Sequence, residues 1–121
     1  MKLILAIGAG SFFGGVFRYL LSLLIHAKTA TTFPLGTLMV NIIGCFFIGV
    51  VFGIFDKGLM SHEWKLFLAT GVLGGFTTFS AFSIEAFALF REGNSTFALL
   101  YILASVLVGL LATYVGYLLV K

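Results

Sequence analysis

Four long apolar runs divide this chain, and a soluble fold of the same length has no interior large enough to bury them. The runs lie at residues 3–26, 35–55, 66–90 and 97–120. At about 1.5 Å per residue, helices of roughly 21 to 25 residues are about 31 to 38 Å long, enough to cross the hydrocarbon core of a bilayer. The runs are continuous rather than alternating, which favours helices over the strands of a membrane barrel. We therefore predict an all-α membrane protein with four transmembrane helices.

The overall composition agrees with the bilayer as solvent. Hydrophobic residues make up 61% of the 121 residues and charged residues 9%, whereas a soluble domain has about a quarter charged residues. The four helices leave no room for a further domain, so we expect a single domain over residues 1–121. We expect a multi-pass protein of the cell (plasma or inner) membrane, in contact with membrane lipid.

The polar residues are too few and too scattered for several classes of function. The sequence shows no Ser/His/Asp set, pair of carboxylates or metal-binding cluster of side chains, so we expect no enzyme. The seven Lys and Arg residues occur singly. They form no basic patch of the kind that nucleic acid requires, so we expect no nucleic-acid partner.

The charges at the helix ends carry only a weak orientation signal. Four spans place both termini on one side of the membrane, so the cations divide four against two: Lys2, Lys57, Lys65 and Lys121 on one side, Lys28 and Arg91 on the other. The positive-inside rule therefore favours neither orientation strongly. Such a chain can insert both ways, and opposed copies can pair as an antiparallel, dual-topology dimer. Because four short helices enclose little volume, we expect function at or near the subunit contacts.

Polar side chains inside the first two runs each need a reason, because polar groups in hydrocarbon are costly. Arg18 lies in the first run, where it is either a headgroup anchor or packing partner, or a source of positive potential at the mouth of an anion path. Asn41 follows Thr37 in the second run and offers two N–H donors and one acceptor. It either forms a hydrogen bond between helices or donates into a pore.

The third run contains a glycine- and threonine-rich stretch at residues 71–83. Glycine and β-branched residues weaken a helix, so we predict that the third helix is broken near its middle. A break at membrane depth persists only where protein buries it or where it lines a cavity, and its freed carbonyls suit a hard cation such as Na⁺. The alternative is a face for close packing, since Gly71 and Gly75 form a GxxxG pair.

Aromatic and polar residues follow this stretch at helical spacing. Phe79 and Phe82 share a helix face, beside a polar stripe of Ser80 and Ser83. The positive edge of a phenyl ring can face an anion without trapping it as a full charge would. Glu85 is the only acid well inside an apolar run; it forms an interfacial salt bridge or hydrogen bond, or it relays protons.

Three segments together give the chain a recognisable pattern: GGVFRY at residues 14–19, GTLMVN at residues 36–41 and GGFTTFSAFS at residues 74–83. With its size, four spans and weak charge bias, the sequence resembles the CrcB/Fluc fluoride channels over nearly its whole length. The resemblance implies a channel that exports fluoride passively and reduces its toxicity in the cytoplasm. It also implies an antiparallel homodimer with two pores, each built from both subunits; pairing with a paralogous subunit is the other possibility.

The resemblance also implies roles for particular residues. Asn41 would be the amide donor of the pore, and Phe79 and Phe82 would turn their ring edges to fluoride. The backbone carbonyls of Gly74 and Thr77, from both copies, would hold a central structural Na⁺ that is not transported. The remaining assignments are Ser80, Ser83 and Thr37 along the polar route and Arg18 at an aqueous vestibule. Ala81 stands where a hydroxyl residue is common in the family.

Two alternatives have similar gross features. A small, dual-topology, proton-coupled multidrug transporter is also short and four-helical, but it needs a glutamate in its first helix, where this chain has Arg18 and no acid. Glu85 is the residue that keeps this alternative open. The second alternative is a membrane assembly subunit without transport activity, in which Asn41 and the Phe79/Phe82 face would have no role.

Overall fold

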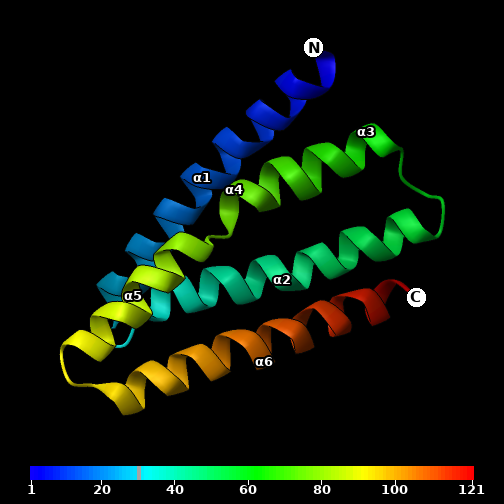
Figure 1. Ribbon diagram of the computed structural model, residues 1–121. Coiled ribbons are helices and arrows are strands. Elements are labelled where there is room, and N and C mark those ends of the chain that lie inside the picture. The colour runs from blue at the N-terminus through cyan, green and yellow to red at the C-terminus, as the bar shows by residue number, and fades with distance from the viewer. Residues whose placement is uncertain (30) are drawn as a thin grey trace.

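The computed structural model describes residues 1–29 and 31–121 and shows an all-helical fold (Figure 1). Its helices are α1 (Lys2–Lys28), α2 (Leu35–Asp56), α3 (His62–Lys65), η1 (Leu66–Leu73), α4 (Gly74–Phe76), α5 (Phe79–Arg91) and α6 (Ser95–Val120). Among the described residues, four helical segments are long and apolar enough to span a membrane, with α3 to α5 forming the third. The predicted all-α fold with four apolar helices is confirmed.

The third span is interrupted near its middle, as predicted. Its first part includes the π-helical segment η1, and α4 ends at Phe76. Thr77 and Thr78 then have extended backbone, with φ/ψ of −86°/158° and −150°/117°. The Thr78 hydroxyl accepts a hydrogen bond from the Ala81 N–H at 3.1 Å and so caps the start of α5.

The same glycine-rich stretch also packs closely, so the two interpretations of it are compatible. A Cβ added at Gly75 would lie 2.6 Å from the Ser11 carbonyl oxygen of α1, and one at Gly14 would lie 2.0 Å from the Val72 carbonyl oxygen of η1. Helices α2 and α6 run side by side (Figure 1) and approach in the same way, with a Cβ at Gly49 reaching 2.0 Å from the Thr113 carbonyl oxygen. Small residues therefore set the distance between the helices.

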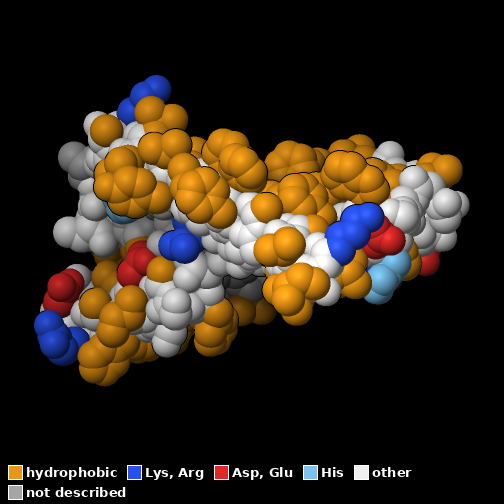
Figure 2. All heavy atoms as spheres, turned by 90° about the horizontal axis from the view of Figure 1, so that it is seen from above, with side chains coloured by type: hydrophobic (Ala, Val, Ile, Leu, Met, Phe, Trp, Pro, Cys, Tyr) orange, Lys and Arg blue, Asp and Glu red, His pale blue; other side chains and the backbone are white. Residues whose placement is uncertain are grey.

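The buried core is small, and apolar side chains cover the outside of the molecule. The core cluster consists of five residues from α2, α5 and α6: Leu38, Ala86, Leu89, Ala98 and Tyr101. Figure 2 shows hydrophobic side chains over most of one face, with charged side chains in a few separate groups. An apolar exterior of this extent fits a chain surrounded by lipid and by other protein.

The connections divide between the two ends of the molecule. The chain termini lie toward the end that holds the α2–α3 connection, and the α1–α2 and α5–α6 connections lie at the opposite end (Figure 1). The interruption in the third span sits between these ends, next to the middle of α2. A single site at mid-depth can therefore combine side chains of α2 with the free backbone of the third span.

Candidate functional site

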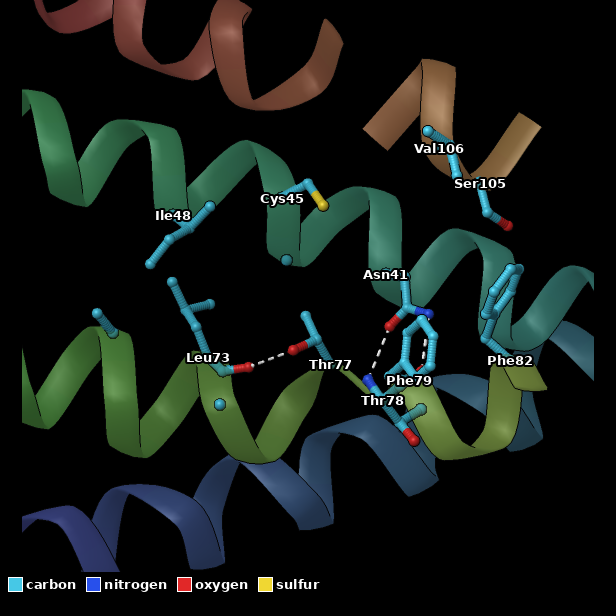
Figure 3. A pocket seen from close by; sticks show the side chains of 13 residues that line it. Asn41, Cys45, Ile48, Leu73, Thr77, Thr78, Phe79, Phe82, Ser105 and Val106 are labelled. Carbon is cyan, nitrogen blue, oxygen red and sulfur yellow. Dashed lines mark hydrogen bonds between the residues drawn. The ribbon is translucent and has the colours of Figure 1, made fainter. Parts of the chain in front are cut away.

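A cavity of about 430 Å³ lies where α2, the interrupted third span and α6 meet (Figure 3). It brings together five residues that the sequence singled out: Asn41, Gly74, Thr77, Phe79 and Phe82. No Lys, Arg, Asp or Glu is among the described residues that line it. The cavity is therefore apolar with a few uncharged polar groups, a lining that suits weak rather than tight contact with an ion.

The amide of Asn41 holds the extended backbone of Thr78 from both sides. Its Nδ2 donates to the Thr78 carbonyl at 3.0 Å, and its Oδ1 accepts from the Thr78 N–H at 2.8 Å (Figure 3). An asparagine amide carries two N–H donors, so one donor of Asn41 is not used by Thr78. The Asn41 side chain thus provides partners for the N–H and the carbonyl of Thr78. It retains one N–H donor beside the cavity.

Two carbonyls of the interruption lose the donors that an unbroken helix would give them. In an α-helix the N–H of residue i+4 donates to the carbonyl of residue i. The N–H of Thr78, the helical donor for Gly74, instead donates to Asn41. The N–H of Ala81, the helical donor for Thr77, instead donates to the Thr78 hydroxyl. Gly74 and Thr77 are the residues whose carbonyls the sequence resemblance assigned to Na⁺, and backbone oxygens suit that ion.

The two phenylalanines lie next to each other but differ in their surroundings. Their ring centroids are 5.5 Å apart and their planes are inclined at 51°. Phe82 is half-buried and packs on Tyr101, with centroids 5.2 Å apart. Phe79 is 79% exposed, although it lines the cavity. Its ring extends beyond what one copy of the chain covers.

Arg18 contacts the interruption directly. Its Nε donates to the Gly75 carbonyl at 3.1 Å, which ties α1 to α4 just before the extended residues. Arg18 is not one of the residues that line the large cavity. The structure therefore shows Arg18 as a packing partner between α1 and α4, and it places a positive charge beside the interruption.

Thr37 and Glu85 form a pair outside the cavity. The buried Thr37 hydroxyl donates to Glu85 Oε1 at 2.5 Å. Glu85 also lines a smaller cavity of about 200 Å³ together with His26 and Glu92. The hydrogen bond that the sequence analysis considered for Glu85 is therefore present, with Thr37 as its donor.

The two serines of the predicted polar stripe lie on the exposed side of α5. Ser80 has its hydroxyl oxygen 3.2 Å from that of Thr78, and neither Ser80 nor Ser83 lines the large cavity. In one copy of the chain, the structure therefore does not bring these serines together with Asn41 and Phe82.

The sequence analysis did not predict several polar groups that lie near the site. Ser105 lines the large cavity, and its hydroxyl and that of Tyr101 are buried without a hydrogen-bond partner among the described residues. Their spacing of four along an apolar run places them on one helix face, a signal that could have found them. The bonds between Thr78 and Asn41 could not be found in this way, because they involve the backbone N–H and carbonyl of Thr78 and not its side chain.

The family model described as CrcB-like protein, Camphor Resistance (CrcB), matches residues 5–117. The chain belongs to the CrcB/FluC family. Relatives named "Fluoride-specific ion channel FluC" occur in Azobacteroides pseudotrichonymphae (42% identity over 122 residues, 100% of this chain and 98% of the relative) and Flavobacterium psychrophilum (45%, with the same coverage). A third, from Rhizobium meliloti, is 47% identical over 96% of this chain and 94% of its own length.

The CrcB/FluC assignment confirms the family resemblance seen in the sequence. It is a family of membrane channels and not of enzymes, as the sequence analysis expected. The relatives cover the chain almost from end to end, so all four apolar helices belong to the matched region.

Proposed function

We propose that this protein is a fluoride-specific ion channel that exports fluoride passively across the cell membrane and lowers its toxicity in the cytoplasm. The observation that carries this conclusion is full-length identity of 42% and 45% to relatives named as fluoride-specific ion channels. The family assignment decides against a multidrug transporter. In the proposed channel Asn41 and the Phe79/Phe82 face have a role, which they would not have in an assembly subunit.

The physical problem is the hydration of fluoride. The ion is small and strongly hydrated, so a pore must replace water with donors and still release the ion. The spare N–H of Asn41 and the positive ring edges of Phe79 and Phe82 are partial charges of the right sign. We assign these three residues to the fluoride pore, with Thr37, Ser80 and Ser83 along its polar route and Arg18 at the vestibule.

Passive flow is sufficient for export. Fluoride enters a cell as HF from an acidic medium and is trapped inside as the anion. A negative-inside potential drives the anion outward by about 2.3 kcal/mol per charge per 100 mV. A channel needs no other energy source for this task.

The working unit in this proposal is an antiparallel homodimer or a pair with a paralogous subunit, with the whole chain as one channel domain. The 79% exposed ring of Phe79 supports it, because this ring lines the cavity yet is left uncovered by its own chain. Each of two pores would then be completed by residues of both subunits. The nearly balanced cations at the helix ends support insertion in both orientations.

The carbonyls of Gly74 and Thr77 from both copies would hold a structural Na⁺ at the centre of this dimer. They fit the ion, because the amides that would bond them in a helix donate elsewhere. When bound, the ion supplies positive charge that ties the two interrupted helices together. Arg18 binds the carbonyl of Gly75, which follows Gly74, and Asn41 binds the carbonyl of Thr78, which follows Thr77.

The test is fluoride release from liposomes that contain only this protein, with chloride-loaded liposomes as the control. We expect rapid fluoride efflux, measured with a fluoride electrode, and no comparable chloride efflux. Retention of fluoride, or equal leakage of chloride, contradicts the proposed function.

A further inference from the structure

Asn41 belongs both to the cavity and to the contacts that hold the interrupted backbone. It lines the cavity, and it also binds the N–H and the carbonyl of Thr78. We propose that Asn41 is the positioning residue of the cation site: by engaging the Thr78 N–H, it keeps the Gly74 carbonyl free to bind Na⁺. This inference rests on the proposed channel and adds a link between its anion pore and its cation site.

The argument begins with the competition for one N–H group. A backbone N–H at membrane depth requires an acceptor, because the surrounding hydrocarbon offers none. The Thr78 N–H has two candidates: the side-chain oxygen of Asn41, which it uses at 2.8 Å, and the Gly74 carbonyl, its helical acceptor. Loss of the Asn41 oxygen therefore favours closure of the helix onto Gly74 and removes that carbonyl from the cation.

The approach of α2 to the interruption supports the same link. Gly44 lies three residues after Asn41, and a Cβ added there would be 2.1 Å from Cγ2 of Thr77. Helix α2 thus contacts the interruption at two successive points, with a bare glycine at one and the Asn41 amide at the other. Asn41 reaches Thr78 because this close approach brings it within hydrogen-bond distance.

The second carbonyl is freed by a different side chain. The hydroxyl of Thr78 accepts from the Ala81 N–H, which leaves Thr77 without its helical donor. This bond does not involve Asn41, so a change at Asn41 removes the acceptor of the Thr78 N–H but not the acceptor of the Ala81 N–H. The two carbonyls can therefore be tested separately, with Thr78→Val as the change that acts on Thr77.

The experiment measures the thermal unfolding midpoint of the purified full-length protein as Na⁺ replaces a bulky organic cation at constant ionic strength. The wild type is expected to gain stability with Na⁺. For Asn41→Ala we expect the half-saturating Na⁺ concentration to rise at least about tenfold, since the residue that keeps the Gly74 carbonyl free is lost from each subunit. Asn41→Asp keeps an acceptor for the Thr78 N–H, so it should retain the Na⁺ response while losing fluoride flux, because its carboxylate repels the anion.

A matched control separates positioning from general stability. Thr113→Val removes a hydrogen bond of 3.0 Å to the Cys45 carbonyl, between α2 and α6, and Thr113 itself neither lines the cavity nor bonds to the interrupted backbone. It should lower the midpoint equally with and without Na⁺, and so leave the half-saturating concentration unchanged. A merely structural role of Asn41 would give this same pattern.

Three results overturn the inference. The first is that Asn41→Ala has the same half-saturating Na⁺ concentration as the wild type. The second is that Asn41→Asp no longer gains stability with Na⁺, a result that can be obtained even if Asn41→Ala does not fold. The third is a thermal unfolding midpoint of the wild type that does not change with the Na⁺ concentration. Absence of fluoride efflux from wild-type liposomes contradicts the proposed function instead, so the two failures are distinguishable.

Discussion

At the scale of single residues, each charged group near the site is matched by a polar partner. The Arg18 guanidinium donates to the Gly75 carbonyl, and the Glu85 carboxylate accepts from the Thr37 hydroxyl. Among the described residues, the cavity of about 430 Å³ is lined mainly by apolar and aromatic side chains, and its polar side chains are uncharged. A fully charged group at that point would bind an anion too firmly to release it.

The aromatic residues can be tested by removing their polar edges while keeping most of their volume. Phe79→Ile and Phe82→Ile should each reduce fluoride efflux by on the order of tenfold, because an alkyl group has no positive edge. Dimers should persist by size-exclusion chromatography. Phe87→Ile is the matched control, since this exposed ring of α5 does not line the cavity. Unchanged efflux in both cavity variants would reject their role in the pore.

The Thr37–Glu85 pair can be tested through stability. Thr37→Val removes the donor and leaves the Glu85 oxygen without it, so we expect a loss of about 1 kcal/mol in the free energy of unfolding. Glu85→Gln keeps a side-chain oxygen that can accept from Thr37 and should cost less. Denaturation in detergent measures both, and equal losses would show that the hydrogen bond does not matter.

At the scale of elements, the third span behaves as two half-helices that neighbouring helices hold in place. Helix α1 packs on η1 and α4 through glycines, and α2 reaches the extended residues through Asn41. Because Thr77 and Thr78 do not make the regular bonds of a helix, these neighbours must satisfy the backbone. The interruption is thus a product of the whole bundle, with its position set by the local sequence.

Two adjacent glycines of α1 provide a matched pair of substitutions. A Cβ at Gly14 would lie 2.0 Å from the Val72 carbonyl oxygen, whereas one at Gly15 meets nothing within 4 Å. Gly14→Ala should therefore lose about 1–3 kcal/mol or more of stability, since backbone must move. Gly15→Ala should be neutral or slightly stabilising, because alanine favours a helix. Thermal unfolding decides, and similar midpoints for the two variants would contradict the close packing of α1 on η1.

At the scale of the whole molecule, the outer surface is the dominant feature. Most large apolar side chains of α1 and α6 are exposed, including the 67% exposed Phe12 and Leu110. Lipid can cover most of this surface, but the exposed ring of Phe79 lines a cavity and is uncovered by its own chain. In the proposed dimer, a second copy of the chain would complete the site and close the cavity.

The dual topology of that arrangement predicts a labelling pattern. In a Cys45→Ser background, Lys57→Cys should react with a membrane-impermeant thiol reagent from outside sealed vesicles in about half of the chains, because the weak charge bias allows both orientations. Lys28→Cys, at the other end of the bundle, is the companion variant and should also react by about half. Complete labelling of one position with none at the other would establish a single orientation.

The sequence alone determined that the chain lies in a lipid bilayer, that it spans the bilayer with four helices, and which region of the third helix is interrupted. Long apolar runs and a cluster of glycine and threonine are local signals, and they act through hydropathy and helix propensity. The beginning of the third span was less clear: the apolar run starts at residue 66, but the helix starts at His62, where the Ser61 hydroxyl accepts from the Trp64 N–H at 3.2 Å. Hydropathy marks membrane depth, whereas side-chain capping marks the helix end.

The candidate site was only partly predictable. The spacing of Phe79 and Phe82 placed them together because residues three apart share a helix face. The Asn41 bond to Thr78, the Arg18 bond to Gly75 and the Thr37 bond to Glu85 join residues 37 to 57 positions apart. Only the tertiary structure decided these pairs, and with them which backbone carbonyls stay free. The reason is physical: in a membrane each polar group must find a partner inside the protein, and packing decides which one is within reach.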